Sequence, residues 1–155
     1  MAMLASGTLA ACSQFATKGT VLEVGDGIGH AIAVDLLQQI PEGKRPASVV
    51  VAPAYLLGQD AATSFFGQSI SDEVSSGLVR NGVRVIDGRV RFRGREFGES
   101  IPVLTFEQAK SIGAAAYVTG NYSYDGSAFR LHYRIINTGD ATVLATSDRV
   151  VRHEN

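Results

Sequence analysis

Three histidines are the residues best suited to acid–base chemistry or metal binding, yet none has a partner at a catalytic spacing. His30 stands near the start of a predicted helix, His132 in an alternating segment and His153 close to the chain end. No HExxH, GxSxG or DxD-like arrangement joins a histidine to a base, a nucleophile or a metal ligand. Asp125 and Asp140 are explained by predicted turns. We therefore predict no catalytic residue, no metal site and no cofactor, and expect His132 to pack across a strand pair.

The single cysteine, Cys12, ends an apolar segment of small residues that resembles a bacterial lipobox, Leu-Ala-Ala-Cys. Small residues before the cysteine admit a lipoprotein signal peptidase, and the thiol is the site of diacylglycerol attachment. One cysteine also excludes an internal disulfide and a cysteine-based metal site. The segment has no Lys or Arg before its apolar run, although a secretory signal normally begins with positive charge. The alternative is a frayed apolar N-terminus with a free or buried thiol.

A cluster of arginines is the one conspicuous charge feature of the chain. In an extended segment, its members would all point to the same face. Such a ladder would suit an anionic partner, either phosphate or an acidic protein surface. The alternative is a solvated sheet face, or an edge strand that charge protects from aggregation. The residues are Arg89, Arg91, Arg93 and Arg95.

Nucleic acid is not an expected partner. The formal net charge is -1, so the chain has no general attraction to nucleic acid or to an anionic membrane surface. Phe92 is the only aromatic residue within the arginine cluster, whereas a nucleic-acid platform interleaves several aromatic residues with its cations.

Three helices are predicted from apolar residues at helical spacing and from start and stop signals. The first spans residues 28–40 and ends at Pro41, and the second spans 64–80 before Asn81-Gly82. The third spans 105–112, where Thr105 and Gln108 form a capping-box pattern.

Strands are expected between and after these helices. Residues 46–53 are a continuous apolar run typical of a buried central strand, and 83–87 follow the second helix, so the two should be parallel. Segments 116–124, 128–135 and 142–152 predict an antiparallel meander, and 20–24 a further short strand. The fold class is therefore α/β (α+β), a small two- or three-layer domain with a mixed sheet of about five strands. With 155 residues, 45% of them hydrophobic, residues 18–155 suit one domain after a signal and tether over 1–17.

Taken in order, these segments resemble the FlgO family of outer-membrane flagellar lipoproteins. The resemblance rests on the first helix with its Gln-Gln-Ile-Pro end, the strand Val-Val-Val-Ala-Pro and the helix that contains Gly-Gln-Ser-Ile-Ser-Asp-Glu-Val. It continues through Val-Arg-Val-Ile-Asp and the segments that begin at Leu104 and Arg134. The same small α/β unit occurs in the N-terminal domain of TolB, in CsgG and in LpoB-type activators of penicillin-binding proteins, so the fold does not choose among their functions.

The resemblance implies a non-enzymatic lipoprotein at the periplasmic face of the outer membrane that supports flagellar assembly or stability, and motility. Cys12 matches the lipidation position of such a family. The implied partners are basal-body or other envelope proteins, and self-association stays open. The alternative is an LpoB-like regulator of peptidoglycan synthesis. A long tether would favour that alternative, but even at about 3.5 Å per residue the tether here reaches only about 60 Å.

Overall fold

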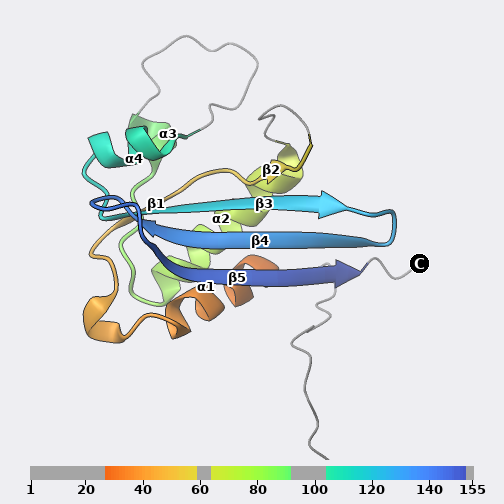
Figure 1. Cartoon of the computed structure of the whole chain (residues 1–155), viewed down its shortest axis with the longest axis horizontal. Coiled ribbons are helices and arrows are strands. Elements are labelled where there is room, and N and C mark those ends of the chain that lie inside the picture. Colours follow the sequence, from red (N-terminus) through yellow and green to blue (C-terminus); the bar gives the residue numbers. More distant parts are fainter. Residues whose placement is uncertain (1–26, 59–63, 92–103, 153–155) are drawn as a thin grey trace, which may run out of the picture.

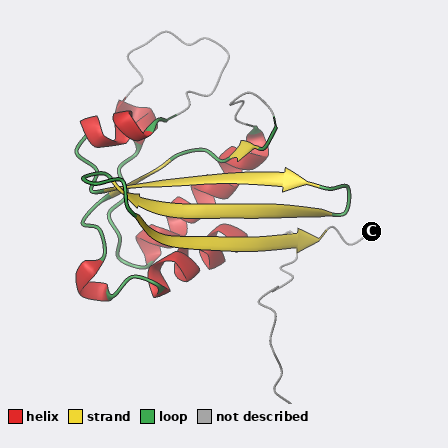
Figure 2. Cartoon of the chain, in the orientation of Figure 1, coloured by secondary structure: helices red, strands yellow, loops and turns green. Residues whose placement is uncertain are grey.

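The computed structural model describes residues 27–58, 64–91 and 104–152. Its sheet has five strands in the order β1-β3-β4-β5, and β2 also pairs with β3 (Figures 1 and 2). The strands β1 and β2 run parallel to β3, whereas β3, β4 and β5 form an antiparallel meander. The predicted α/β class and mixed sheet are therefore confirmed. The strands are β1 (Val49–Val51), β2 (Tyr55–Leu56), β3 (Ala116–Tyr124), β4 (Ala128–Asn137) and β5 (Val143–Arg152).

The three predicted helices are present, and their signals act as expected. They are α1 (Ile28–Gln38), α2 (Phe65–Arg80) and α4 (Phe106–Ser111), accompanied by a 3-10 turn η1 (Glu42–Lys44) and a short helix α3 (Gly88–Arg91). The Ser64 hydroxyl accepts the Gly67 N–H at 3.0 Å and so caps α2. Thr105 and Gln108 form the capping box of α4.

The predicted strand over 83–87 is reduced to one parallel bridge between Val85 and Val49. Two backbone hydrogen bonds form this bridge. The Val49 N–H donates to the Arg84 carbonyl at 2.9 Å, and the Ile86 N–H donates to the Val49 carbonyl at 2.8 Å. The partner strand β1 has only three residues, so it offers few backbone groups for a longer ladder. The parallel direction was predicted correctly and the strand length was not. The segment 20–24 lies outside the described residues.

Helices cover the two faces of the sheet unequally. Figure 1 shows β3, β4 and β5 in front of α1 and α2, with α3 and α4 at one end of the sheet. Successive residues of β1 divide between two cores, because Val49 belongs to the cluster with α1 and α2, and Val50 to the smaller cluster with α4. Both are fully buried, as expected for a central strand. Since α4 has only six residues, most of that second face lies beyond it.

Two glycines allow the layers of the main core to come close together, because neither carries a side chain that would hold its neighbours apart. A Cβ built on Gly77 of α2 would lie 2.7 Å from the Ala33 Cβ and 2.9 Å from the His30 Cα of α1. A Cβ on Gly120 of β3 would lie 2.5 Å from the ring of Tyr133, its cross-strand partner in β4. Helix α1 therefore packs directly against Gly77, and the Tyr133 ring packs directly against Gly120. A larger residue at either position would collide with these neighbours.

Buried hydroxyl groups tie α2 to the sheet. The Ser71 Oγ accepts the Ala54 N–H at 3.0 Å and lies 3.0 Å from the Tyr133 hydroxyl. Tyr133 is fully buried, and burial raises the pKa of its hydroxyl well above the ordinary value. It therefore stays a neutral hydrogen-bonding group that fixes α2 over β4.

Candidate functional site

The predicted arginine ladder is not extended where the structure describes it. Residues Gly88–Arg91 form the short helix α3, and the Asp87 carboxylate accepts the Arg89 N–H at 2.9 Å, which favours a helix start. The Arg89 guanidinium pairs with Asp72 at 3.1 Å and with Asp87 at 3.4 Å. The side chain of Arg91 lies outside the described residues, as do Arg93, Arg95 and Cys12. Arg89 thus ties α3 to α2 in the structure.

A different set of charged residues gathers on the sheet. Pleating places every second residue of β3, β4 and β5 on the face opposite α1 and α2, and we call this the open face. Across the middle of this face, register aligns one residue from each of four strands: Tyr55, Asn121, His132 and Asp148. The flanking residues of the open face are Thr119, Ser123, Arg130, Arg134, Thr146, Val150 and Arg152. The surface is polar and rich in hydrogen-bonding groups.

Positive charge exceeds negative charge on the open face. His132 Nδ1 lies 2.5 Å from the Asp148 carboxylate, the cross-strand contact expected of this histidine. Arg130 lies 3.4 Å from Asp125. Arg134 and Arg152 are exposed and form no ion pair within the described part of the chain. Two guanidinium groups on this face are therefore left to contact a partner.

Both turn aspartates have the structural role that the sequence predicts. Asp125 accepts the backbone N–H and the hydroxyl of Ser127 and the Ala128 N–H, at 2.9 to 3.0 Å. Bonds from Ser127 and Ala128 lower the pKa of Asp125 to about 2. The hydroxyl and N–H of Thr142 likewise lower the pKa of Asp140. These carboxylates stay ionised and hold the turns on either side of β4.

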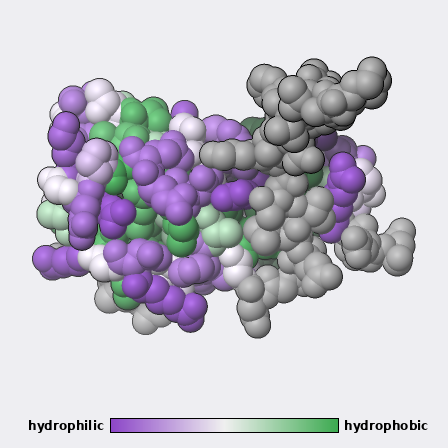
Figure 3. Space-filling view, turned by 90° about the horizontal axis from the view of Figure 1, so that it is seen from below, coloured by the Kyte–Doolittle hydropathy of each residue, from purple (hydrophilic) through white to green (hydrophobic). Residues whose placement is uncertain are grey.

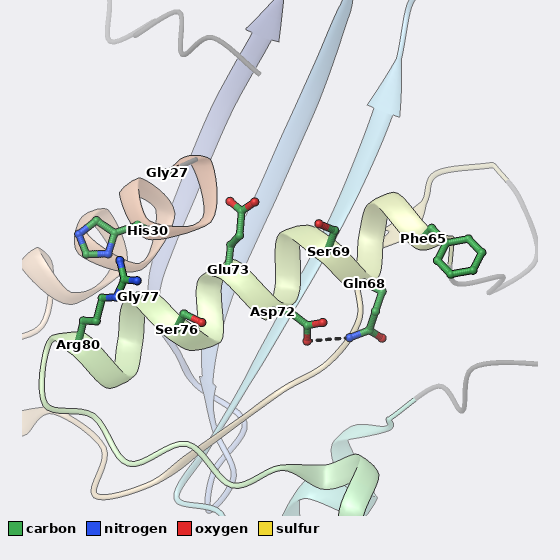
Figure 4. Close-up of a pocket in the computed structure, with 10 residues that line it drawn as sticks. All are labelled: Gly27, His30, Phe65, Gln68, Ser69, Asp72, Glu73, Ser76, Gly77 and Arg80. Carbon is green, nitrogen blue, oxygen red and sulfur yellow. Dashed lines mark hydrogen bonds between the residues drawn. The ribbon is translucent and has the colours of Figure 1, made fainter. Parts of the chain in front are cut away.

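The other candidate site is a shallow groove of about 740 Å³ along the outer side of α2 (Figure 4). Midway along α2, Glu73 accepts the Gly29 N–H at 3.0 Å and so caps α1 from the neighbouring helix. In Figure 4, Arg80 points toward His30, whereas Phe65 points away at the opposite end of α2. The Nδ1 atom of His30 is buried and has no hydrogen-bond partner among the residues that the structure describes. Gly77 explains this placement, because it lets His30 lie directly against α2.

Within the described residues, neither surface brings together the parts of a catalytic centre. No hydroxyl or thiol group of the described residues hydrogen-bonds to His132 or His30. Within the same residues, no three His, Cys, Asp or Glu side chains are grouped to hold a metal ion. None of the described helices is long and apolar enough to cross a bilayer. The geometry offers surfaces for contact with a partner.

The sequence predicted β4 correctly, but no role was assigned to the arginines of this strand. The alternation across residues 128–135 already places Arg130 and Arg134 beside His132 on one face. What the sequence did not reveal is which face remains uncovered. That depends on α1 and α2 both packing on the opposite side.

Comparisons with known proteins agree with this fold. A family model described as FlgO protein matches residues 30–155. The LpoB C-terminal domain from Escherichia coli has a TM-score of 0.61 at 14% identity, and the match covers 83% of this chain and 98% of that one. Lipoprotein GNA1162 from Neisseria meningitidis has a TM-score of 0.55 at 14% identity, over 71% of this chain and 83% of that one. At such identities the likeness concerns the fold alone. No curated protein sequence matches the chain significantly.

Proposed function

Since the chain belongs to the FlgO family, we propose that it is a non-enzymatic lipoprotein of the bacterial cell envelope that supports flagellar assembly or stability, and thereby motility. A lipid on Cys12 anchors it in the outer membrane with its domain facing the periplasm. It acts through contacts with basal-body or other envelope proteins. The observation that carries this proposal is the family match over residues 30–155.

The described residues support a role in protein contact. The open face is polar, and its two arginines that form no ion pair among the described residues, Arg134 and Arg152, suit carboxylates of a partner. Its three long strands hold these groups on a rigid support. Arg89, Arg91, Arg93 and Arg95 remain a second proposed partner site, although Arg89 is already paired within the chain.

A regulator of peptidoglycan synthesis is the second candidate. The fold similarity to the LpoB C-terminal domain from Escherichia coli favours it, with 98% of that domain covered. In that case the same open face would dock on a penicillin-binding protein. Identifying the partner therefore decides between the two functions.

We would cross-link the protein in intact cells, isolate the membrane fraction and identify what co-purifies. Flagellar ring components should co-purify with the wild type and be lost with Cys12→Ala, because the anchor places the domain beside them. Recovery of a penicillin-binding protein instead would establish the second candidate. A soluble protein with no partner would refute both.

Two charge-reversed variants would locate the contact. Arg134→Glu changes the open face, whereas Arg91→Glu with Arg93→Glu changes the arginine cluster. Arg134 is exposed, so Arg134→Glu should leave circular dichroism unchanged, because charge changes at exposed positions rarely cost more than about 0.5 kcal/mol of stability. We expect the double variant to keep the fold as well, and the same measurement checks it. We expect Arg134→Glu to lower the cross-linking yield and Lys110→Glu, at an exposed position of α4, to leave it unchanged. If only Arg91→Glu with Arg93→Glu lowers the cross-linking yield, the partner binds at the arginine cluster and not on the open face.

A further inference from the structure

The edge strand β5 has a free side whose backbone direction the structure fixes. β5 pairs with β4 on one side, and no described strand pairs with the other. The Gln39 side chain shows the backbone direction at Thr146. Its amide oxygen accepts the Thr146 N–H at 3.2 Å, and its amide nitrogen donates to the Thr146 carbonyl at 2.6 Å, so both backbone groups of Thr146 point to the free side. Backbone direction alternates along a strand. Asp148, Val150 and Arg152 therefore present their N–H and C=O groups to the same side.

Gln39 seals this edge at one residue only. Its amide occupies the position that a neighbouring strand would take at Thr146, while Asp35 of the same helix accepts the Ser147 hydroxyl at 2.7 Å. Beyond Thr146, no backbone bond to the free side of β5 is found within the described residues. Charge, proline or a cover protects an unpaired edge strand from non-selective pairing. Among the described residues no strand pairs with the free side of Asp148–Arg152, and the charges of Asp148 and Arg152 restrict this edge to a partner of complementary charge.

We propose that β5 pairs antiparallel with β5 of a second copy of this chain, about a two-fold axis at Val150. In this register Val150 lies opposite its own counterpart, and Asp148 lies opposite Arg152 of the second copy. The two-fold axis repeats that contact, so each dimer gains two carboxylate–guanidinium pairs. Each opposed pair of free-side residues also exchanges two backbone hydrogen bonds. The sheet becomes continuous across both copies.

Charge selects this register over its neighbours. An axis at Asp148 would set two carboxylates opposite each other and bring the second strand against the Gln39 amide. An axis at Arg149 would oppose two guanidinium groups on the helix side, where each already pairs with Asp35 at 3.4 Å. An axis at Val151 would place Arg152 opposite Val150 and leave it without a carboxylate. Only the axis at Val150 opposes unlike charges, and like charges directly opposite are destabilising.

The free-side residues of the proposed contact are Asp148, Val150 and Arg152, of which two are charged. In Figure 3, which views the molecule from below the orientation of Figure 1, hydrophilic residues form most of the visible described surface, with hydrophobic areas between them. A contact held by backbone bonds and two charge pairs needs no large apolar patch. This inference does not depend on the flagellar role, since it concerns only the pairing of two copies.

The test is sedimentation equilibrium of the full chain carrying Cys12→Ser, which prevents a disulfide between copies, over about 1 µM to about 1 mM protein. We expect a monomer–dimer equilibrium. Asp148→Arg or Arg152→Asp alone should raise the dimer Kd at least about tenfold, because each breaks both charge pairs. The double variant with both changes should restore the dimer. Lys110→Glu is the matched control and should leave the Kd unchanged.

A second pair of variants tests the backbone bonds. Val150→Pro removes an N–H that points away from β4, so it spares the β4–β5 ladder while it blocks the second strand. Val150→Thr keeps that N–H and should still dimerise. A monomer at every concentration would overturn the proposal. So would a dimer that survives Val150→Pro, or one that the charge exchange does not restore.

Discussion

Adding one methyl group at Gly120 should cost more stability than most core substitutions of that size. The new Cβ would lie 2.5 Å from two atoms of the Tyr133 ring. The ring cannot move aside easily, because Tyr133 is fully buried and its hydroxyl lies 3.0 Å from the Ser71 Oγ. Gly120→Ala therefore forces either the ring or β3 out of place.

The size of the effect follows from three contributions. Overpacking costs about 1–3 kcal/mol, and loss of the Tyr133–Ser71 hydrogen bond about 1 kcal/mol more. Replacing glycine in a strand returns about 0.5–1 kcal/mol, because the unfolded chain loses freedom. The net loss is about 1–3.5 kcal/mol, a large part of a domain's usual stability of about 5–15 kcal/mol.

Urea unfolding of Gly120→Ala, Tyr133→Leu and the double variant measures this. Tyr133→Leu alone should cost about 2–4 kcal/mol, since it leaves a cavity and removes the hydroxyl. In the double variant the smaller side chain makes room for the methyl group, so its loss should fall short of the sum by at least about 1 kcal/mol. Strict additivity, or an unchanged midpoint for Gly120→Ala, would refute the idea that the ring needs this space.

Two further changes probe the helix pair and the hairpin. Gly77→Ala should lower the free energy of unfolding by about 1–2 kcal/mol despite the better helix propensity of alanine, because the new Cβ meets Ala33 at 2.7 Å. Gly43→Ala, with nothing within 4 Å, is its control in the same denaturation series, and equal midpoints would contradict the close-packing argument. Asp125 has its pKa lowered from 3.8 to about 2, so its stabilising contribution is complete above about pH 4 and is lost as pH falls toward 2. Asp125→Asn should therefore weaken the acid dependence of unfolding in that window, and an unchanged pH profile would show that the turn bonds do not matter.

Local signals predicted the described elements well. The capping box at Thr105 and the turn at Asp125 each act through neighbouring residues, so the sequence contains the whole interaction. The alternation of apolar and polar residues likewise predicted β4 and showed which of its side chains share a face.

The errors arose where distant parts of the chain decide the outcome. The segment 83–87 has strand-like residues, but it pairs only as far as the three-residue β1 allows. Residues 88–91 were expected to be extended because the charges of the arginine segment alternate, whereas Asp87 accepts the Arg89 N–H and a short helix begins there. The use of Gly120 as space for an aromatic ring depends on a register set by a hairpin, and no single stretch of sequence reveals it.

The contacts between α1 and β5 also determine when this domain becomes complete. Asp35 and Ser147 are separated by 112 positions, and Gln39 and Thr146 by 107, so the first described helix is fastened to the final strand. The apolar side of α1 faces a sheet whose three long strands all come late in the chain. During synthesis from the N-terminus, α1 and α2 are therefore made before the surface that buries them. Contacts this distant in sequence make folding slow relative to helical bundles, and they make the final ten-residue strand the step that closes the core.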